Sequence, residues 1–145
     1  MCGRAYNDLS LIEIQDISQT DDTQGDLPHS RGWNLAPSSI LPCICNKNNR
    51  KFSSSPKDKT LSLSEPQKYP KSDRQIVTMK WGWALNTLIN ARGEEILEKI
   101  LFRPYLLNRC VVLVEGVFEW DKDRNPYKYI IGEGKKLFIA AIYNS

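Results

Sequence analysis

Cys2 directly follows the initiator methionine, and loss of Met1 would give this residue unusual chemistry. Methionine aminopeptidases remove Met1 when the second residue is small, as cysteine is. The mature chain then begins with an α-amine and a thiol on neighbouring carbons. The thiolate can act as a nucleophile with the α-amine as its own base. Alternatively, the amine condenses with an aldehyde to an imine, and the thiol closes onto it as a thiazolidine ring. In a third reading, Cys2 is an incidental small residue.

Asn90 and Arg92 form a second group in the segment Asn90-Ala91-Arg92-Gly93-Glu94. At the start of a helix they can direct an amide and a guanidinium at one ligand, and the guanidinium fork matches phosphate oxygens. The alternative is that Asn90 caps the helix while Arg92 lies on its solvated face.

Glu119 belongs to a third group, Gly116-Val117-Phe118-Glu119-Trp120, at the end of an apolar run. A carboxylate directly after such a run is partly desolvated, which suits a general acid or base. An exposed glutamate at the end of a strand is the alternative.

Histidine and the other cysteines do not form a metal-binding pattern. His29 is the one histidine, and Cys43 and Cys45 are separated by one residue instead of the two to four of a zinc knuckle. We therefore expect no metal and no cofactor. Cys110 opens an apolar run and is expected to be a buried small hydrophobe.

Composition favours one domain in a reducing compartment. The chain has 145 residues, 41% hydrophobic and 26% charged, as in soluble globular proteins. It has neither the roughly 20 apolar residues of a membrane span nor the apolar run of a secretory signal, so we expect free cysteines, no membrane contact and no secretion. The net charge is +3, and residues 47–80 hold nine Lys and Arg against three Asp and Glu. This segment reads as a solvated loop or as a basic nucleic-acid-binding segment.

Local patterns predict the elements that must position these groups. Strands or extended segments are predicted at 33–45, 76–83, 111–118, 127–131 and 137–143, and a short helix at 91–101. The β-branched run 111–118 is the predicted central strand, and the last two strands are predicted as a pair around residues 132–134. Residues 16–32 read as a surface loop and about 46–75 as a disordered polar insertion. The expected fold class is α+β, with a curved, mainly antiparallel, barrel-like sheet core and short helices. Because the chain stops just after an apolar strand, we expect it to be a fragment of a longer domain.

Several motifs in order along the chain resemble those of the SOS response-associated peptidase (SRAP) family. They are Met1-Cys2-Gly3-Arg4, Trp33-Asn34-Leu35-Ala36-Pro37, Met79-Lys80-Trp81-Gly82, Asn90-Ala91-Arg92-Gly93-Glu94, and Arg109-Cys110-Val111-Val112 leading to Gly116-Val117-Phe118-Glu119-Trp120. The resemblance covers nearly the whole chain and implies an SRAP-like fold. The family's His-x-Arg-Met-Pro segment has no counterpart here, and His29 lies far too early in family order to replace it.

The resemblance also implies a role for each site residue. Cys2 resembles the catalytic cysteine, which is exposed by removal of Met1 and bonds to the ring-opened aldehyde of an abasic deoxyribose in single-stranded DNA. Asn90 resembles the asparagine that holds the cysteine and the sugar, and Glu119 the glutamate that assists proton transfer. Arg4 and Arg92 resemble residues that grip phosphates. Trp81 looks like an apolar wall near the DNA, where rings can stack on exposed bases.

The resemblance predicts a monomeric, nuclear (or prokaryotic cytoplasmic) protein that crosslinks to abasic sites and protects them during the DNA damage response. Two alternatives stay open. In the first, Cys2 is the nucleophile of a peptidase that acts on other proteins. In the second, the chain binds nucleic acid without covalent chemistry, through Arg4, Arg92 and residues 47–80.

Overall fold

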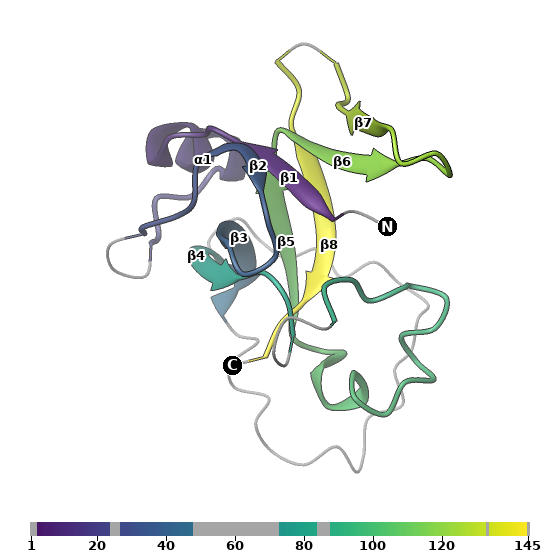
Figure 1. Ribbon diagram of the computed structural model, residues 1–145. Helices are drawn as coiled ribbons and strands as arrows, with labels where there is room; N and C mark the ends of the chain where they lie inside the picture. Colours follow the sequence, from purple (N-terminus) through teal and green to yellow (C-terminus); the bar gives the residue numbers. More distant parts are fainter. Residues whose placement is uncertain (1–2, 24–26, 48–72, 84–87, 133, 145) are drawn as a thin grey trace.

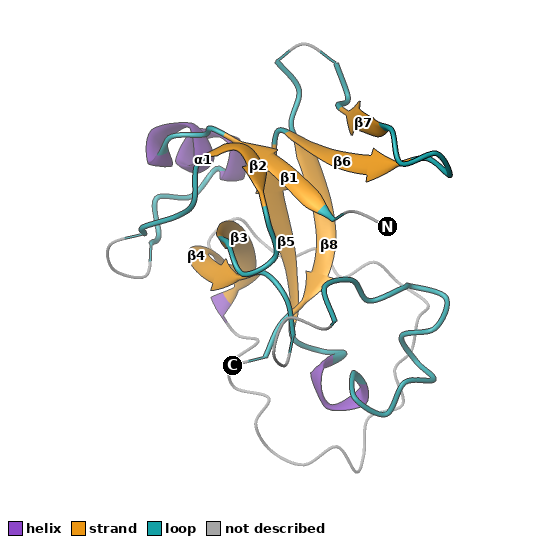
Figure 2. Ribbon diagram, in the orientation of Figure 1, coloured by secondary structure: helices purple, strands orange, loops and turns teal. Residues whose placement is uncertain are grey.

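The computed structural model describes residues 3–23, 27–47, 73–83, 88–132 and 134–144. Within these ranges the chain forms two four-stranded antiparallel sheets and one α-helix (Figures 1 and 2). Sheet A has the order β2-β1-β6-β7, with strands Gly32–Leu35, Arg4–Asn7, Gly116–Trp120 and Pro126–Tyr129. Sheet B has the order β4-β3-β5-β8, with strands Arg74–Lys80, Ile40–Asn46, Arg109–Val114 and Leu137–Ile142. The expectation of mainly antiparallel sheets is confirmed, but the described strands form two separate sheets and no closed barrel.

Glu115 divides the apolar run that was predicted to be one central strand. β5 ends at Val114 in sheet B, and β6 begins at Gly116 in sheet A. The backbone N–H of Glu115 donates to the carbonyl of Tyr6 at 3.0 Å, so the chain already pairs with β1 at this residue. The prediction of a single strand over 111–118 was wrong, because β-branched residues favour extended backbone without specifying which sheet it joins.

The core consists of three clusters around sheet B. The first packs sheet A onto sheet B and contains Ala5, Leu35, Leu41, Val114 and Val117, with Trp81 against it. The second lies under the helix and contains Leu9, Ile14, Leu27, Ile76 and Leu113. The third contains Cys43, Cys45, Val77, Cys110 and Tyr143. The burial of Cys110, which is 6% exposed, confirms the sequence-based prediction.

Helix α1 (Leu11–Ser18) ends inside the segment 16–32, which was expected to be a surface loop. Ser10 and Glu13 form a capping box in which each side chain accepts from the other's backbone N–H, at 3.3 and 2.8 Å. Ile14 is 1% exposed and joins the cluster beneath the helix. The Ser-x-x-Glu spacing was a signal for this helix that the sequence reading did not use.

The helix predicted over 91–101 is absent from the structure. Residues 93–98 form turns, and the one regular element nearby is the 3-10 helix η3 (Arg103–Tyr105). Leu97, Ile100 and Leu101 are 59%, 79% and 42% exposed. A short helix depends on burying one face against the protein, and these apolar side chains find no such partner surface. The possibility that Asn90 caps an α-helix at this position is therefore ruled out.

The last two predicted strands exist but do not pair with each other. β7 pairs with β6 in sheet A, and β8 pairs with β5 in sheet B. Most of the expected polar insertion, residues 48–72, lies outside the described residues. At its two expected ends, Asn46 and Arg74 are paired across β3 and β4.

Candidate functional site

The start of the described chain lies beside the end of β6. β1 and β6 run antiparallel, with Arg4 opposite Phe118 and Ala5 opposite Val117. A Cβ atom on Gly3 would lie 3.4 Å from Cζ3 of Trp120, so the Trp120 ring packs against the backbone of Gly3. Cys2 itself lies outside the described residues, but the residue bonded to it is thereby placed next to the Glu119-Trp120 pair.

Glu119 shares a face of β6 with the buried Val117, because side chains alternate along a strand. It lies opposite Tyr127 of β7 and is half-buried, whereas Val117 is 8% exposed in the cluster between the sheets. The carboxylate therefore lies at the margin of the apolar core, on the face of sheet A that is turned toward sheet B.

Trp81 fixes the segment that carries Asn90 against this same cluster. Its indole Nε1 donates to the carbonyl of Ile89 at 2.9 Å, and its ring packs on the cluster that contains Ala5 and Val117. Because Ile89 precedes Asn90, the hydrogen bond holds the backbone at Asn90 close to the apolar patch. Glu119 and Asn90 are thus connected with this cluster through neighbouring residues, Val117 on β6 and Ile89 beneath Trp81.

The two arginines of the predicted site are placed differently. Arg4 lies on the opposite face of β1 from Ala5, so the pleat directs it away from the cluster that Glu119 borders. Arg92 is half exposed, and its Nη1 lies 3.8 Å from Oε1 of Glu95. The structure therefore does not gather Arg4 with Glu119 on one face of sheet A.

Glu115 is a shielded carboxylate that the sequence reading missed, and it anchors the crossing from sheet B to sheet A. Its Oε2 accepts from the backbone N–H of Asp8 at 2.8 Å, and its Oε1 accepts from Nζ of Lys136 at 2.6 Å. The ion pair is largely shielded from water, with side-chain exposures of 17% and 19%. Burial alone would raise the pKa of Glu115, but the hydrogen bonds from Lys136 and Asp8 outweigh it and hold this pKa below its usual value. In the sequence, the signal for this role of Glu115 was its charge inside the otherwise apolar run VVLVEGVF.

All 145 residues match the family model described as SOS response associated peptidase (SRAP). The chain belongs to the SRAP family. A Saccharomyces cerevisiae relative, named abasic site processing protein YMR114C, is 32% identical over 91 residues, which are 52% of this chain and 25% of that protein. A Bacillus subtilis relative, abasic site processing protein YoaM, is 24% identical over 157 aligned residues, covering 99% of this chain and 59% of that protein. The chain thus spans between a quarter and three-fifths of the length of these relatives.

Three other cysteines of this SRAP chain are free thiols, as expected, and all three are buried: Cys43, Cys45 and Cys110. The hydrogen bond with Cys110 and burial raise the pKa of the Cys43 thiol well above its usual value. A thiol with a raised pKa forms little thiolate and is a poor nucleophile. The Cys43 thiol therefore serves packing in sheet B, where Cys45 and Cys110 are buried in the same cluster.

His29 has a structural role away from Glu119. Its Nε2 lies 2.8 Å from the carbonyl oxygen of Leu9 and its Nδ1 lies 3.2 Å from that of Leu27. The ring thus connects the 27–29 segment to the residues that precede α1.

Within the described ranges, no cluster of three or more His, Cys, Asp or Glu side chains is arranged to hold a metal ion, and no helix is long and apolar enough to cross a membrane.

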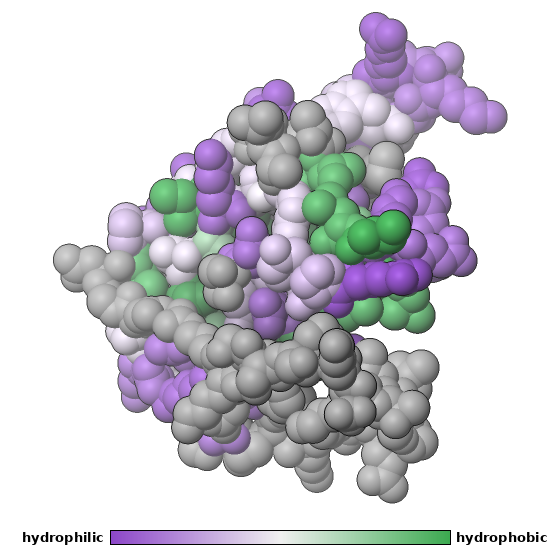
Figure 3. Space-filling model, turned by 90° about the horizontal axis from the view of Figure 1, so that it is seen from below, coloured by the Kyte–Doolittle hydropathy of each residue, from purple (hydrophilic) through white to green (hydrophobic). Residues whose placement is uncertain are grey.

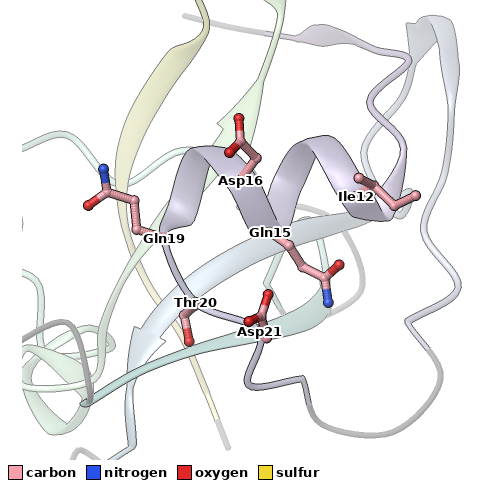
Figure 4. A pocket seen from close by; sticks show the side chains of 6 residues that line it. All are labelled: Ile12, Gln15, Asp16, Gln19, Thr20 and Asp21. Atoms are coloured by element: carbon pink, nitrogen blue, oxygen red, sulfur yellow. The ribbon is translucent and has the colours of Figure 1, made fainter.

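A shallow depression lies on the other side of the molecule, along α1. Figure 4 shows that the side chains around it diverge over the helix surface instead of converging on one point. Its lining residues are Ile12, Gln15, Asp16, Gln19, Thr20 and Asp21. It contains none of the predicted site residues. Figure 3 shows the molecule from below, where hydrophobic and hydrophilic side chains are mixed.

Proposed function

We propose that this chain captures abasic sites in single-stranded DNA through a covalent bond to Cys2. Membership of the SRAP family and the two relatives named abasic site processing proteins support DNA processing at such lesions. The observation that supports covalent capture by Cys2 is the pairing of β1 with β6. There Gly3 lies against Trp120, the residue that follows Glu119. The residue that follows Cys2 is thereby held next to a half-buried carboxylate.

The proposed reaction begins after Met1 is removed. The free α-amine of Cys2 attacks the aldehyde carbon of the ring-opened deoxyribose, and loss of one water gives an imine. The Cys2 sulfur then adds to the imine carbon while the nitrogen takes up a proton, which closes a thiazolidine ring. Both a carbon–nitrogen and a carbon–sulfur bond must break to reverse the adduct, so it should survive denaturation.

Glu119 supplies the proton transfers of this sequence. Its position at the edge of the apolar cluster suits a carboxyl that donates a proton to the leaving water and accepts one from the thiol. Asn90 orients the cysteine and the sugar from the segment that Trp81 anchors. The open-chain aldehyde is a minor form of the sugar, so a well-placed amine is needed to trap it. Arg4 and Arg92 hold flanking phosphates.

A denaturing gel tests the proposal. The protein is mixed with a single-stranded oligonucleotide that carries one abasic site, beside the same oligonucleotide without the lesion. We expect a shifted band that requires both Cys2 and the lesion. Cys2→Ala keeps an α-amine after loss of Met1 but cannot close the ring, so its adduct should dissociate on heating. An undiminished, heat-stable band from Cys2→Ala would refute the proposed role of the thiol.

Peptide hydrolysis is a second candidate, because the family's description includes the word peptidase. In that case the same Cys2 thiolate attacks a peptide carbonyl with the α-amine as its base. Turnover of a peptide library by the protein, lost in Cys2→Ala, would support this activity. Cleavage confined to removal of Met1 would count against it.

A further inference from the structure

Tyr6 and Trp33 form an exposed stacked pair on sheet A. Their ring centroids are 4.3 Å apart, and the ring planes differ by 14°. Tyr6 lies on β1 and Trp33 on the edge strand β2. Trp33 is 65% exposed, so most of its surface is in contact with water. A contiguous pair of aromatic rings at the surface is a candidate interaction site.

Two cations share this outer face. Nζ of Lys128 lies 4.1 Å from the centroid of Tyr6 and 4.6 Å from that of Trp33. Arg4, Phe118 and Lys128 form one row across β1, β6 and β7, and Tyr6 lies two residues along β1 from Arg4. Because alternate residues share a face, Arg4 and Tyr6 both point away from the buried Ala5. We call Arg4, Tyr6, Trp33 and Lys128 the aromatic platform.

Nearby carboxylates do not cancel the positive charge of the aromatic platform. Asp8 pairs with Arg31 at 3.0 Å, and Glu115 pairs with Lys136 at 2.6 Å. Both of these acidic side chains thus have their own cation and do not offset the positive charges of Arg4 and Lys128. Phosphate groups are complementary to such a surface.

The aromatic platform is continuous with the start of the chain. Trp120 packs on Gly3, and Tyr6 lies three residues farther along the chain, on β1. Three residues of strand span roughly 10 Å, which is the scale of a few nucleotides. Because Glu119 borders the opposite face of sheet A, a strand of DNA whose lesion is held beside Glu119 would pass around the Gly3 end of β1 to reach the rings.

We propose that the aromatic platform is a stacking site for an unpaired base of single-stranded DNA, with Lys128 and Arg4 contacting its phosphates. Sequence-independent binding of single strands combines such rings with cations along the backbone. The position of this base beside the lesion rests on the proposed function, but stacking itself requires no lesion and no Cys2.

Fluorescence anisotropy with a labelled single strand that lacks an abasic site tests the proposal. We expect Trp33→Ala to weaken binding at least about fivefold, since one stacked base contributes about 1–3 kcal/mol. Trp33→Phe should bind better than Trp33→Leu, because leucine has apolar bulk without an aromatic face. Lys128→Met should weaken binding and lower the slope of log affinity against log salt by about one. Ile12→Ala, at a 77% exposed apolar residue on α1, is the matched control and should bind like the parent protein.

Two outcomes would overturn the aromatic platform: no binding of the intact single strand by the parent protein, or equal binding by folded Trp33→Phe and Trp33→Leu. Duplex DNA of the same sequence should not compete, because its bases are already stacked, and full competition would also overturn it. The covalent gel assay is scored separately on lesion DNA at saturating concentration. If no crosslink forms but Trp33→Ala still weakens binding of the intact single strand, the proposed function alone is refuted. If the crosslink forms but binding does not depend on Trp33, the aromatic platform alone is refuted.

Discussion

Glu115 and Glu119 lie four residues apart and have different surroundings. Glu115 is bound on both oxygens, by Asp8 and Lys136, at the point where the chain passes from sheet B to sheet A. Glu119 is half-buried beside the apolar cluster, close to the start of the chain. The first carboxylate is therefore a structural anchor, whereas the second is placed to transfer protons in the proposed reaction.

Glu119→Gln should slow adduct formation by roughly 10²–10⁴-fold, the usual contribution of a positioned acid or base. The amide keeps the shape of the side chain but cannot transfer a proton. Single-turnover rates of adduct formation, measured on denaturing gels, provide the test. Glu94→Gln, at an exposed residue, is the matched control and should react at the parent rate. An unchanged rate for Glu119→Gln would remove Glu119 from the chemistry.

Glu115→Gln should destabilise the fold at neutral pH by about 1–3 kcal/mol, because it weakens hydrogen bonds to a charged group. The pKa of Glu115 is lowered in the folded chain, so its ionised form stabilises the fold above the ordinary carboxyl pKa. That stabilisation is lost as the pH falls through the folded-state pKa.

The difference in free energy of unfolding between parent and Glu115→Gln should therefore shrink as the pH is lowered from 7 through the carboxyl range. Urea titrations at several pH values measure it. Glu98→Gln, at an exposed residue, should show almost no difference at any pH. A difference for Glu115→Gln that is constant with pH would show that the ion pair with Lys136 is not its source.

At the level of elements, the β6–β7 pairing depends on Gly116. A Cβ atom at this position would lie 2.9 Å from the carbonyl oxygen of Tyr129 and 3.0 Å from Cγ2 of Ile130. Backbone cannot move aside as a flexible side chain can, so Gly116→Ala should cost about 1–3 kcal/mol. Because β6 carries Glu119, it should also slow adduct formation.

Gly93→Ala provides the comparison for this substitution. An added Cβ at Gly93 meets no atom within 4 Å, and the residue is exposed in a turn. Thermal unfolding of the two variants should show a clear loss for Gly116→Ala and almost none for Gly93→Ala. Equal melting temperatures would mean that β7 moves away from β6 without cost.

The sequence predicted those elements whose formation depends on residues close together in the chain. Alternating or β-branched runs predicted the positions of β3, β4 and β8. The exchange of sheets at Glu115 has no local cause, since it arises from the pairing of Tyr6 with Glu115 across more than 100 residues. The predicted helix over 91–101 failed because its apolar residues are not covered. Helix α1 was predictable from its capping box.

At the scale of the whole molecule, the site depends on the contact between the two sheets. Ala5 and Val117 of sheet A share one cluster with Leu41 and Val114 of sheet B, and Trp81 joins it after β4. This cluster joins β1 and β6 to Trp81, which in turn holds the backbone at Ile89. Motif order was the basis for predicting the site residues, whereas pairing between distant strands decided that Arg4 and Tyr6 face away from Ala5, on the aromatic platform.

The mass of the intact reaction product tests the central claim most directly. The protein is incubated with a single-stranded oligonucleotide that carries one abasic site, and the mixture is analysed under denaturing conditions. The account predicts a species whose mass is that of the chain without Met1 plus the oligonucleotide, less one water, and which is absent for Cys2→Ala after heating. Recovery of the two components alone, from protein that is folded and has lost Met1, would contradict it.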